Sequence, residues 1–307
     1  MAVYDSFYGL RASPFTISPD PAFLFLSRTH REALAGLIYA ICERKGFALL
    51  AGEVGTGKTT LVHSILSQLG DRVRSAFIYN PHLAREELYQ ELLSDFGLPA
   101  TPTVRTAVHA LQRYLLEQFR AGRPVVLILD EAHVLSDETI EELRVLSNFE
   151  TPSAKLLQIV LVGQPELLER VNTHRLRALR QRITVRLELR PLSLEESIAY
   201  VRTRLERAGR RGELFTPRAQ VALYEYTRGL PRALNTLADN ALLVGLARNQ
   251  ASVDAPLVHA AADNLGVERS VRVSLFRRLR RRAVTDSEDT EMATMNEFIE
   301  QLLEPVR

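Results

Sequence analysis

Short apolar runs alternate with segments of helical periodicity between residues 47 and 190. The helical segments repeat apolar residues every three to four positions, which gives each helix one apolar face. Runs that are apolar throughout are typical of strands covered on both faces, as in a parallel sheet. We therefore predict an α/β fold, a parallel five-stranded sheet between helices, with strands at 47–51, 76–79, 125–129, 156–162 and 183–189.

The pattern changes after residue 190, where helical signals follow one another without strand-like runs. Ser193 and Glu196 form a capping box that starts a helix, and Gly209 is placed to end it. Thr216 and Pro217 then suit the N-cap and first turn of the next helix. These signals predict a small all-helical lid domain after the α/β domain. The predicted boundaries are 1–190 for the α/β domain, 191–266 for the helical domain and 267–307 for a tail.

Composition is that of an ordinary globular protein, with 46% apolar and 25% charged residues. A single cysteine, Cys42, rules out an internal disulfide framework and fits a reducing compartment. The sequence shows neither a basic leader with an apolar core nor a run of about 18 apolar residues. We therefore expect no signal peptide and no membrane span, and a cytoplasmic location.

The stretch GEVGTGKTT matches the phosphate-binding pattern G-x-x-x-x-G-K-[ST] and lies between a predicted strand and a predicted helix. Glycines let the backbone turn its N–H groups toward a phosphate at the positive end of the helix. Lys58 is expected to reach the β- and γ-phosphates of ATP, and the Thr59 hydroxyl to bind Mg²⁺. The predicted nucleotide-binding residues are Gly52, Glu53, Val54, Gly55, Thr56, Gly57, Lys58, Thr59 and Thr60.

The run VVLIL is followed by the string DEAH, which is also the name of a class of RNA helicases. After a phosphate loop, an aspartate at a strand end suits Mg²⁺ and the next glutamate suits the attacking water. We assign these roles to Asp130 and Glu131, respectively. The helicase interpretation fails because the residues after Asp130 complete one sheet and then become helical, whereas such helicases need a second sheet domain.

A phosphate-loop domain followed by a small helical domain is the layout of AAA+ ATPases, and further parts can be sought by position. Gln164, after the next strand, suits a sensor of the γ-phosphate or the lytic water. Arg180 or Arg182, before the last strand, suits a finger that reaches a neighbouring subunit's nucleotide. Arg232, at a helix start, suits a second sensor on the lid. A finger acting in trans predicts a homo-oligomer.

The strings GFALLAGEVGTGKTTL, LDEAH, LRVLSNFET, LLQIVLVGQPEL, LRQRI and GLPRALN occur in this order. Over residues 4–266 the chain resembles bacterial AAA+ ATPases of the ExeA or GspA type, including relatives encoded with exopolysaccharide and exosortase systems. The resemblance implies an Mg²⁺-dependent ATPase, forming a hexameric ring or a filament. It also implies a role in assembling or regulating an envelope secretion or polysaccharide export system, with a protein of that system as partner.

The resemblance also implies that residues 1–45 form a base-contacting segment, with Pro14–Phe25 against the nucleotide base. Two features depart from the family. His133 stands where members commonly have Gln. A histidine there suits tuning or sensing of the phosphate end of the site, but we favour the simpler interpretation, a polar residue at a helix entry. Secretion members continue into a transmembrane helix and a periplasmic peptidoglycan-binding part, neither of which is recognisable in this sequence.

The last part of the chain is strongly charged. Seven arginines lie between Arg269 and Arg282, interleaved with apolar residues, and an acidic stretch follows. Such a segment suits an anionic membrane surface, which would place the protein peripherally at the inner membrane, or DNA phosphates. It is equally consistent with a self-neutralised flexible tail. The arginine block favours one alternative function, a DNA-binding transposition regulator of the TniB or TnsC type. A second alternative, independent of the tail, is a regulatory nucleotide switch that hydrolyses ATP slowly and mainly binds a protein partner.

Overall fold

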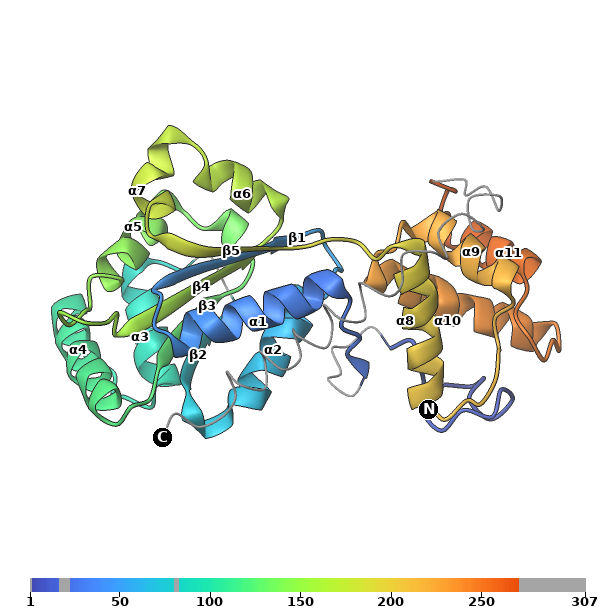
Figure 1. The fold of residues 1–307 in the computed structure, drawn as a ribbon, viewed down its shortest axis with the longest axis horizontal. Helices are drawn as coiled ribbons and strands as arrows, with labels where there is room; N and C mark the ends of the chain where they lie inside the picture. The colour runs from blue at the N-terminus through green and yellow to red at the C-terminus, as the bar shows by residue number, and fades with distance from the viewer. Residues whose placement is uncertain (1, 17–22, 80–82, 271–307) are drawn as a thin grey trace, which may run out of the picture. The chain divides into compact units, whose positions relative to one another are not determined.

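The computed structural model describes residues 2–16, 23–79 and 83–270, which form two compact units (Figure 1). One is an α/β unit of residues 28–53 and 61–189. The other is a helical unit made of the described residues among 1–27, 54–60 and 190–291. Each unit has its own apolar core.

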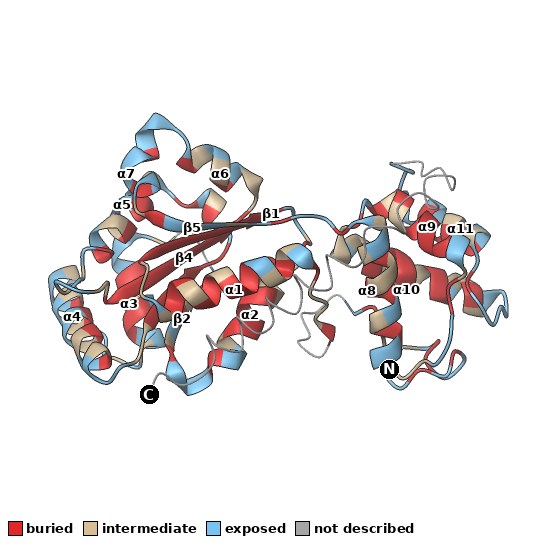
Figure 2. Ribbon diagram, in the orientation of Figure 1, coloured by how far each residue is buried: buried red, intermediate tan, exposed pale blue. Residues whose placement is uncertain are grey.

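A single sheet of five parallel strands forms the centre of the α/β unit, with the order β2-β3-β4-β1-β5. The predicted fold class and all five predicted strands are confirmed. β1, β3 and β4 are buried along their whole lengths, as their continuous apolar runs require (Figure 2). The strands are β1 (Phe47–Gly52), β2 (Arg74–Ile78), β3 (Val125–Leu129), β4 (Leu157–Gly163) and β5 (Ile183–Leu189).

Helices cover both faces of this sheet (Figure 1). Helix α1 lies close to β5, where a side chain at Gly36 would meet Leu187 at 2.8 Å. On the other face, alternate residues of β1, such as Leu49, join a core cluster with the later helices. The helices are α1 (Arg28–Cys42), α2 (Lys58–Leu69), α3 (Arg85–Asp95), α4 (Val104–Arg120), α5 (Asp137–Leu146), α6 (Pro165–Val171) and α7 (Arg177–Arg180), with short 3₁₀ turns η2 (Gly70–Arg72), η3 (Ala132–Val134) and η4 (His174–Leu176).

Four helices build most of the helical unit, and its predicted caps are present. The Ser193 hydroxyl accepts the Glu196 N–H at 3.1 Å, while the Glu196 carboxylate accepts the Ser193 N–H. Thr216 caps the next helix, and Gly209 follows the end of the first with φ of 88°. The helices are α8 (Leu194–Arg207), α9 (Pro217–Thr227), α10 (Pro231–Ala247) and α11 (Ala255–Leu265). Within the described ranges, no helix has both the length and the apolar character of a membrane span.

The described N-terminal residues belong to the helical unit, although the predicted boundary places them with the sheet. Tyr4, Tyr8 and Phe15 are buried in the core of the helical unit, and the Phe15 ring meets Phe215 edge to face at 6.0 Å. Arg204 of α8 donates to the carbonyl of Pro14. These N-terminal residues form no helix or strand, so their apolar positions do not recur at a regular spacing. The sequence pattern therefore could not show which of the two cores they join.

The turn before α10 requires a glycine, which yields a stability prediction. Gly229 has φ of 75°, and an added Cβ would lie 1.9 Å from the carbonyl oxygen of Leu192. Gly212 in the same unit has φ of 88° but has no atom within 4 Å of that position. We expect Gly229→Ala to lower the free energy of unfolding by about 3 kcal/mol, and Gly212→Ala by only about 1 kcal/mol.

Urea unfolding of both variants, followed by the helical circular dichroism signal, measures this difference. The strain of a positive φ is common to both variants, so only the clash separates them. Equal shifts of the two unfolding midpoints would contradict the close approach of Gly229 to Leu192.

Candidate active site

Three neighbouring strands lead, at their carboxyl ends, into several of the predicted site residues. β4 pairs in parallel with β1 on one side and with β3 on the other. Residues 53–57 follow β1, Asp130 follows β3, and Gln164 follows β4. Ligands of open parallel sheets bind at this edge, where loops leave the strands. The strand order therefore assembles segments that are more than 100 residues apart in sequence.

The phosphate loop has the backbone that its glycines predict. Gly55 and Gly57 have φ of 81° and 96°, which residues with a Cβ rarely adopt. α2 begins at Lys58, directly after this turn. Thr56 and Lys58 are buried. The loop thus leads into the amino end of a helix, where backbone N–H groups and the helix dipole favour a phosphate.

Arg232 lies against this loop within the same unit. Its backbone N–H donates to the carbonyl oxygen of Gly55 at 3.2 Å. A Cβ at Gly55 would be 2.7 Å from the Cβ of Arg232, so the loop tolerates no side chain there. Pro231 occupies the first turn of α10 and fixes where this helix starts. Arg232, predicted as a second sensor, is therefore adjacent to the phosphate loop.

The two acidic residues after β3 differ in their surroundings. Asp130 is 6% exposed, and its Oδ1 accepts the backbone N–H of Glu131 at 2.9 Å. Glu131 has φ of 51°, the left-handed conformation, and its side chain is 50% exposed. That backbone conformation costs a non-glycine residue about 1–2 kcal/mol. The buried carboxylate suits a metal ligand, and the exposed one is available to solvent.

Glu131, His133 and Gln164 lie in a row at the carboxyl edge. The Gln164 side-chain Nε2 is 3.0 Å from His133 Nε2. On the other side of the ring, His133 Nδ1 is 3.3 Å from Glu131 Oε2. His133, for which a role at the phosphate end was the less favoured interpretation, thus lies between the predicted water-activating residue and the predicted sensor.

The turn that carries His133 is clamped by two helices. Arg170 of α6 donates to the His133 carbonyl oxygen at 3.1 Å and to Asp137 Oδ1 at 2.7 Å. This Arg170 hydrogen bond, aided by Arg175, holds the pKa of the Asp137 carboxyl below its usual range. A Cβ at Gly163 would be 3.1 Å from the His133 backbone nitrogen, so the absence of a side chain there lets the turn pack against β4.

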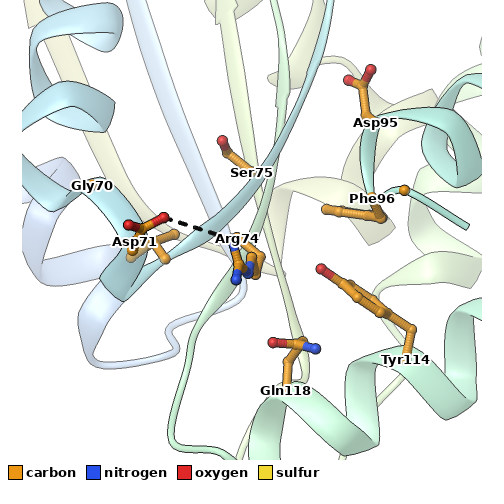
Figure 3. A pocket seen from close by; sticks show the side chains of 10 residues that line it. Gly70, Asp71, Arg74, Ser75, Asp95, Phe96, Tyr114 and Gln118 are labelled. Atoms are coloured by element: carbon orange, nitrogen blue, oxygen red, sulfur yellow. Dashed lines mark ion pairs between the residues drawn. The ribbon is translucent and has the colours of Figure 1, made fainter.

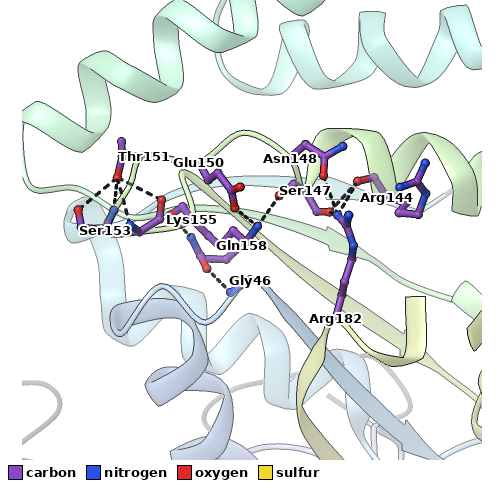
Figure 4. Close-up of polar contacts among 11 residues, drawn as sticks. Gly46, Arg144, Ser147, Asn148, Glu150, Thr151, Ser153, Lys155, Gln158 and Arg182 are labelled. Atoms are coloured by element: carbon purple, nitrogen blue, oxygen red, sulfur yellow. Dashed lines mark hydrogen bonds and ion pairs between the residues drawn. The ribbon is translucent and has the colours of Figure 1, made fainter. Parts of the chain in front are cut away.

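The two candidate finger arginines are held very differently. Arg182 Nη1 donates to the Arg144 carbonyl at 3.1 Å, to Asn148 Oδ1 at 2.9 Å, and to Ser147 Oγ (Figure 4). Arg180 is exposed and makes one long hydrogen bond, from Nη1 to the Asn172 carbonyl at 3.4 Å. Arg182 therefore anchors the end of α5 inside its own chain, whereas the Arg180 side chain extends toward solvent.

The residues present fit a magnesium ion as well as a nucleotide. A threonine hydroxyl at Thr59 and a carboxylate at Asp130 are oxygen ligands, which Mg²⁺ prefers together with phosphate oxygens and water. Among the residues that the structure describes, no group of three or more His, Cys, Asp or Glu side chains could hold a metal alone. This donor set matches an ion that arrives with a nucleotide.

A cavity of about 520 Å³ lies at the opposite end of β2, near its first residues (Figure 3). Arg74, Asp95, Tyr114 and Gln118 are among the residues that line it. It contains no part of the phosphate loop or of the acidic pair. The cavity is therefore separate from the predicted nucleotide-binding residues.

The sequence of this chain is similar to those of known proteins. Residues 41–171 match the model of an AAA domain. The chain is 42% identical over 248 residues to general secretion pathway protein A of Aeromonas hydrophila, a match covering 80% of this chain and 45% of that protein. Residues 41–171 therefore belong to the AAA domain family, and the chain is related to general secretion pathway protein A. The AAA protein thus spans less than half the length of this relative.

Solved structures share the fold of this AAA protein. The ORC2 protein of Aeropyrum pernix has a TM-score of 0.59 at 20% identity, covering 78% of this chain and 68% of that one. The RuvB branch migration motor of Thermotoga maritima has a TM-score of 0.56 at 18% identity, covering 89% and 83%. These likenesses support the α/β fold.

The phosphate loop and the acidic pair could be predicted from the sequence because both motifs are local. The sequence left the role of His133 open and did not indicate Arg170 or Asp137, because their contacts join separate elements. A usable signal was the string VGQ, since a glycine directly before the sensor position marks a close backbone approach.

The unequal anchoring of Arg182 and Arg180 predicts unequal effects on stability. Arg182→Ala removes the donor for three acceptors, buried Ser147, the Arg144 carbonyl and Asn148. This loss should lower the free energy of unfolding by about 2 kcal/mol. Arg180→Ala removes an exposed side chain and should change stability by less than about 0.5 kcal/mol. Thermal unfolding of the two variants beside the parent protein measures both values, and equal losses would refute the assigned roles.

Proposed function

We propose that this AAA protein binds ATP with Mg²⁺ and hydrolyses it to ADP and phosphate. The observation that carries the proposal is the order of β1, β4 and β3. It brings the ends of these strands together, and with them the phosphate loop, Gln164 and the Asp130–Glu131 pair. Membership of the AAA family supports nucleotide binding.

In this proposal each residue has one task. The loop N–H groups and Lys58 hold the β- and γ-phosphates and stabilise charge that builds up on the γ-phosphoryl group. Thr59 and Asp130 hold the metal ion, which neutralises phosphate charge when bound. Glu131 orients the attacking water and accepts its proton, and Gln164 contacts that water or the γ-phosphate. Arg232, beside Gly55, senses the phosphates from the helical unit.

We assign the arginine finger to Arg180 and propose that it acts on the nucleotide of a neighbouring copy. An exposed guanidinium with one long hydrogen bond can reach another subunit, whereas Arg182 would first have to leave three acceptors. Hydrolysis then requires a homo-oligomer, as a ring or a filament. In either form, each site takes its water-activating Glu131 and its Arg180 from different copies.

The biological role that we propose is assembly or regulation of an envelope secretion or polysaccharide export system, in the cytoplasm or peripherally at the inner membrane. The support is the identity to general secretion pathway protein A over 80% of this chain. The DNA-binding alternative draws on the arginines from Arg269 to Arg282. Of these, Arg269 pairs with buried Glu225 of α9, and residues 271–282 lie outside the described residues. We favour the secretion-related role because the identity to general secretion pathway protein A extends over 80% of this chain.

Two substitutions separate binding from hydrolysis. Lys58→Ala should weaken ATP affinity at least tenfold because it removes the phosphate-binding cation. Glu131→Gln should keep the affinity within about twofold and lower turnover by a hundredfold or more, since only water activation is lost. Fluorescence titration with a labelled ATP analogue and a phosphate-release assay measure the two quantities. Normal turnover in Glu131→Gln would overturn the site.

A mixing experiment tests the finger. Arg180→Ala and Glu131→Gln proteins should each be nearly inactive alone. In mixed oligomers, an Arg180→Ala subunit keeps its own Glu131 and can receive Arg180 from a Glu131→Gln neighbour, so that site is intact. In an equal mixture about half of the sites have the first subunit and about half of those have the second as neighbour, so about a quarter of parent activity should return. A mixture of Lys58→Ala with Glu131→Gln is the matched control, because neither subunit can supply a complete site. Absence of recovery in the first mixture would contradict a trans-acting Arg180.

A further inference from the structure

We propose that His133 is a positioning residue that couples Glu131 to Gln164. This inference rests on the proposed hydrolysis of ATP and names the residue through which the two sides of the reacting water are linked. His133 touches neither substrate nor metal in this proposal. It acts by holding the Glu131 carboxylate toward the attacking water while Gln164 donates to the ring.

The hydrogen-bond chemistry fixes which ring nitrogen carries the proton. A glutamine side-chain nitrogen is a donor only, so at 3.0 Å from His133 Nε2 it makes that ring nitrogen the acceptor. A neutral ring that accepts at Nε2 carries its hydrogen on Nδ1. Nδ1 is the atom that lies 3.3 Å from Glu131 Oε2. The row thus runs from the amide donor through the ring to the carboxylate.

The contact between His133 and Glu131 is close but incomplete. Nδ1 is buried, and no acceptor among the described residues is aligned to form a hydrogen bond with it. A buried N–H without a partner is unfavourable, and the nearest carboxylate belongs to a side chain that is half exposed and can rotate. Rotation of Glu131 toward the ring completes the bond, and rotation away leaves the carboxylate facing solvent. Two arrangements of Glu131 follow from one fixed ring.

The ring is the fixed part of this pair. The side chain of His133 is only 16% exposed, and Arg170 holds its carbonyl oxygen at 3.1 Å. Arg170 is itself held by Asp137, and the absence of a side chain at Gly163 keeps the turn close to β4. Glu131, in contrast, stands on a left-handed backbone with an exposed side chain. Glu131 is therefore the part that moves.

A functional coupling follows from this arrangement. When the amide oxygen of Gln164 accepts a hydrogen bond from the attacking water, its nitrogen keeps donating to His133 Nε2. The ring then keeps its Nδ1–H form, which donates to Glu131 and holds the carboxylate toward the water. Loss of either side chain releases Glu131 and leaves the water without an oriented base.

Substitution of His133 tests the proposal by separating turnover from binding. His133→Phe keeps a flat ring without nitrogens, and we expect kcat to fall about tenfold, with KM and the affinity for labelled ATP unchanged within about twofold. His133→Asn keeps a nitrogen near Nδ1 and His133→Gln keeps one near Nε2, so each should lose less than His133→Phe. The same substitutions at His109, exposed on α4, are the matched controls and should leave kcat unchanged.

A double-mutant cycle tests the coupling itself, which a purely structural role would not produce. If His133 transmits the state of Gln164, then Gln164→Ala should lower kcat far less in the His133→Phe background than in the parent protein. Losses that simply multiply would overturn the coupling, and so would an unchanged kcat in His133→Phe. Melting temperatures of all variants identify any loss caused by unfolding.

The same data distinguish this inference from the proposed function. A parent protein that releases no phosphate from ATP overturns the proposed function, and the coupling with it. A parent protein that hydrolyses ATP, together with multiplying losses in the cycle, overturns the coupling alone. Nitrogen chemical shifts of His133 give an independent reading: we expect a protonated Nδ1 in the parent and a changed tautomer ratio in Gln164→Ala. An Nε2–H form in the parent would contradict the proposal.

Discussion

Parallel pairing of β4 between β1 and β3 is the constraint on which the site depends. Every residue of β4 is buried, and its two sets of hydrogen bonds fix the registers of both neighbours. The carboxyl ends of β1, β3 and β4 therefore lie at one edge of the sheet, where Asp130 and Glu131 follow β3 and Gln164 follows β4. A one-residue slip in β3 would turn Asp130 to the other face of the sheet. The continuous apolar runs that bury these strands thus also position the chemistry.

Close contacts at three glycines fix the positions of further segments around the sheet and in the helical unit. Glycine at 55 admits Arg232, glycine at 229 admits the Leu192 carbonyl, and glycine at 163 admits the turn that carries His133. In each case an added Cβ would lie within about 3 Å of another residue, so space as well as backbone freedom selects glycine. The contact at Gly55 places Arg232, a predicted sensor, beside the phosphate loop. The contact at Gly163 keeps the turn with His133 near Gln164, the other predicted sensor.

Local signals made much of this predictable from the sequence. The five strands and the caps at Ser193 and Thr216 each depend on residues within a few positions, and the structure contains all of them. The position of the N-terminal residues was not predictable, because Tyr4 and Phe15 reveal burial without revealing the partner. The choice between Arg180 and Arg182 depends on acceptors over 30 residues away, at the end of α5. The contacts of His133 likewise join the end of β3, which leads to Glu131, with the end of β4, which leads to Gln164, so no local pattern could show them.

The central claim is that this strand edge hydrolyses ATP with Glu131 directed at the water and Arg180 supplied by another copy. A structure of the assembled protein with Mg²⁺, ADP and a fluoride analogue of the transferred phosphate tests it most directly. The account predicts the metal on Thr59 and Asp130, Glu131 and Gln164 at the attacking water, and Arg180 of the adjacent copy at the fluoride. A nucleotide bound elsewhere, or a complete site formed within one copy, would contradict it.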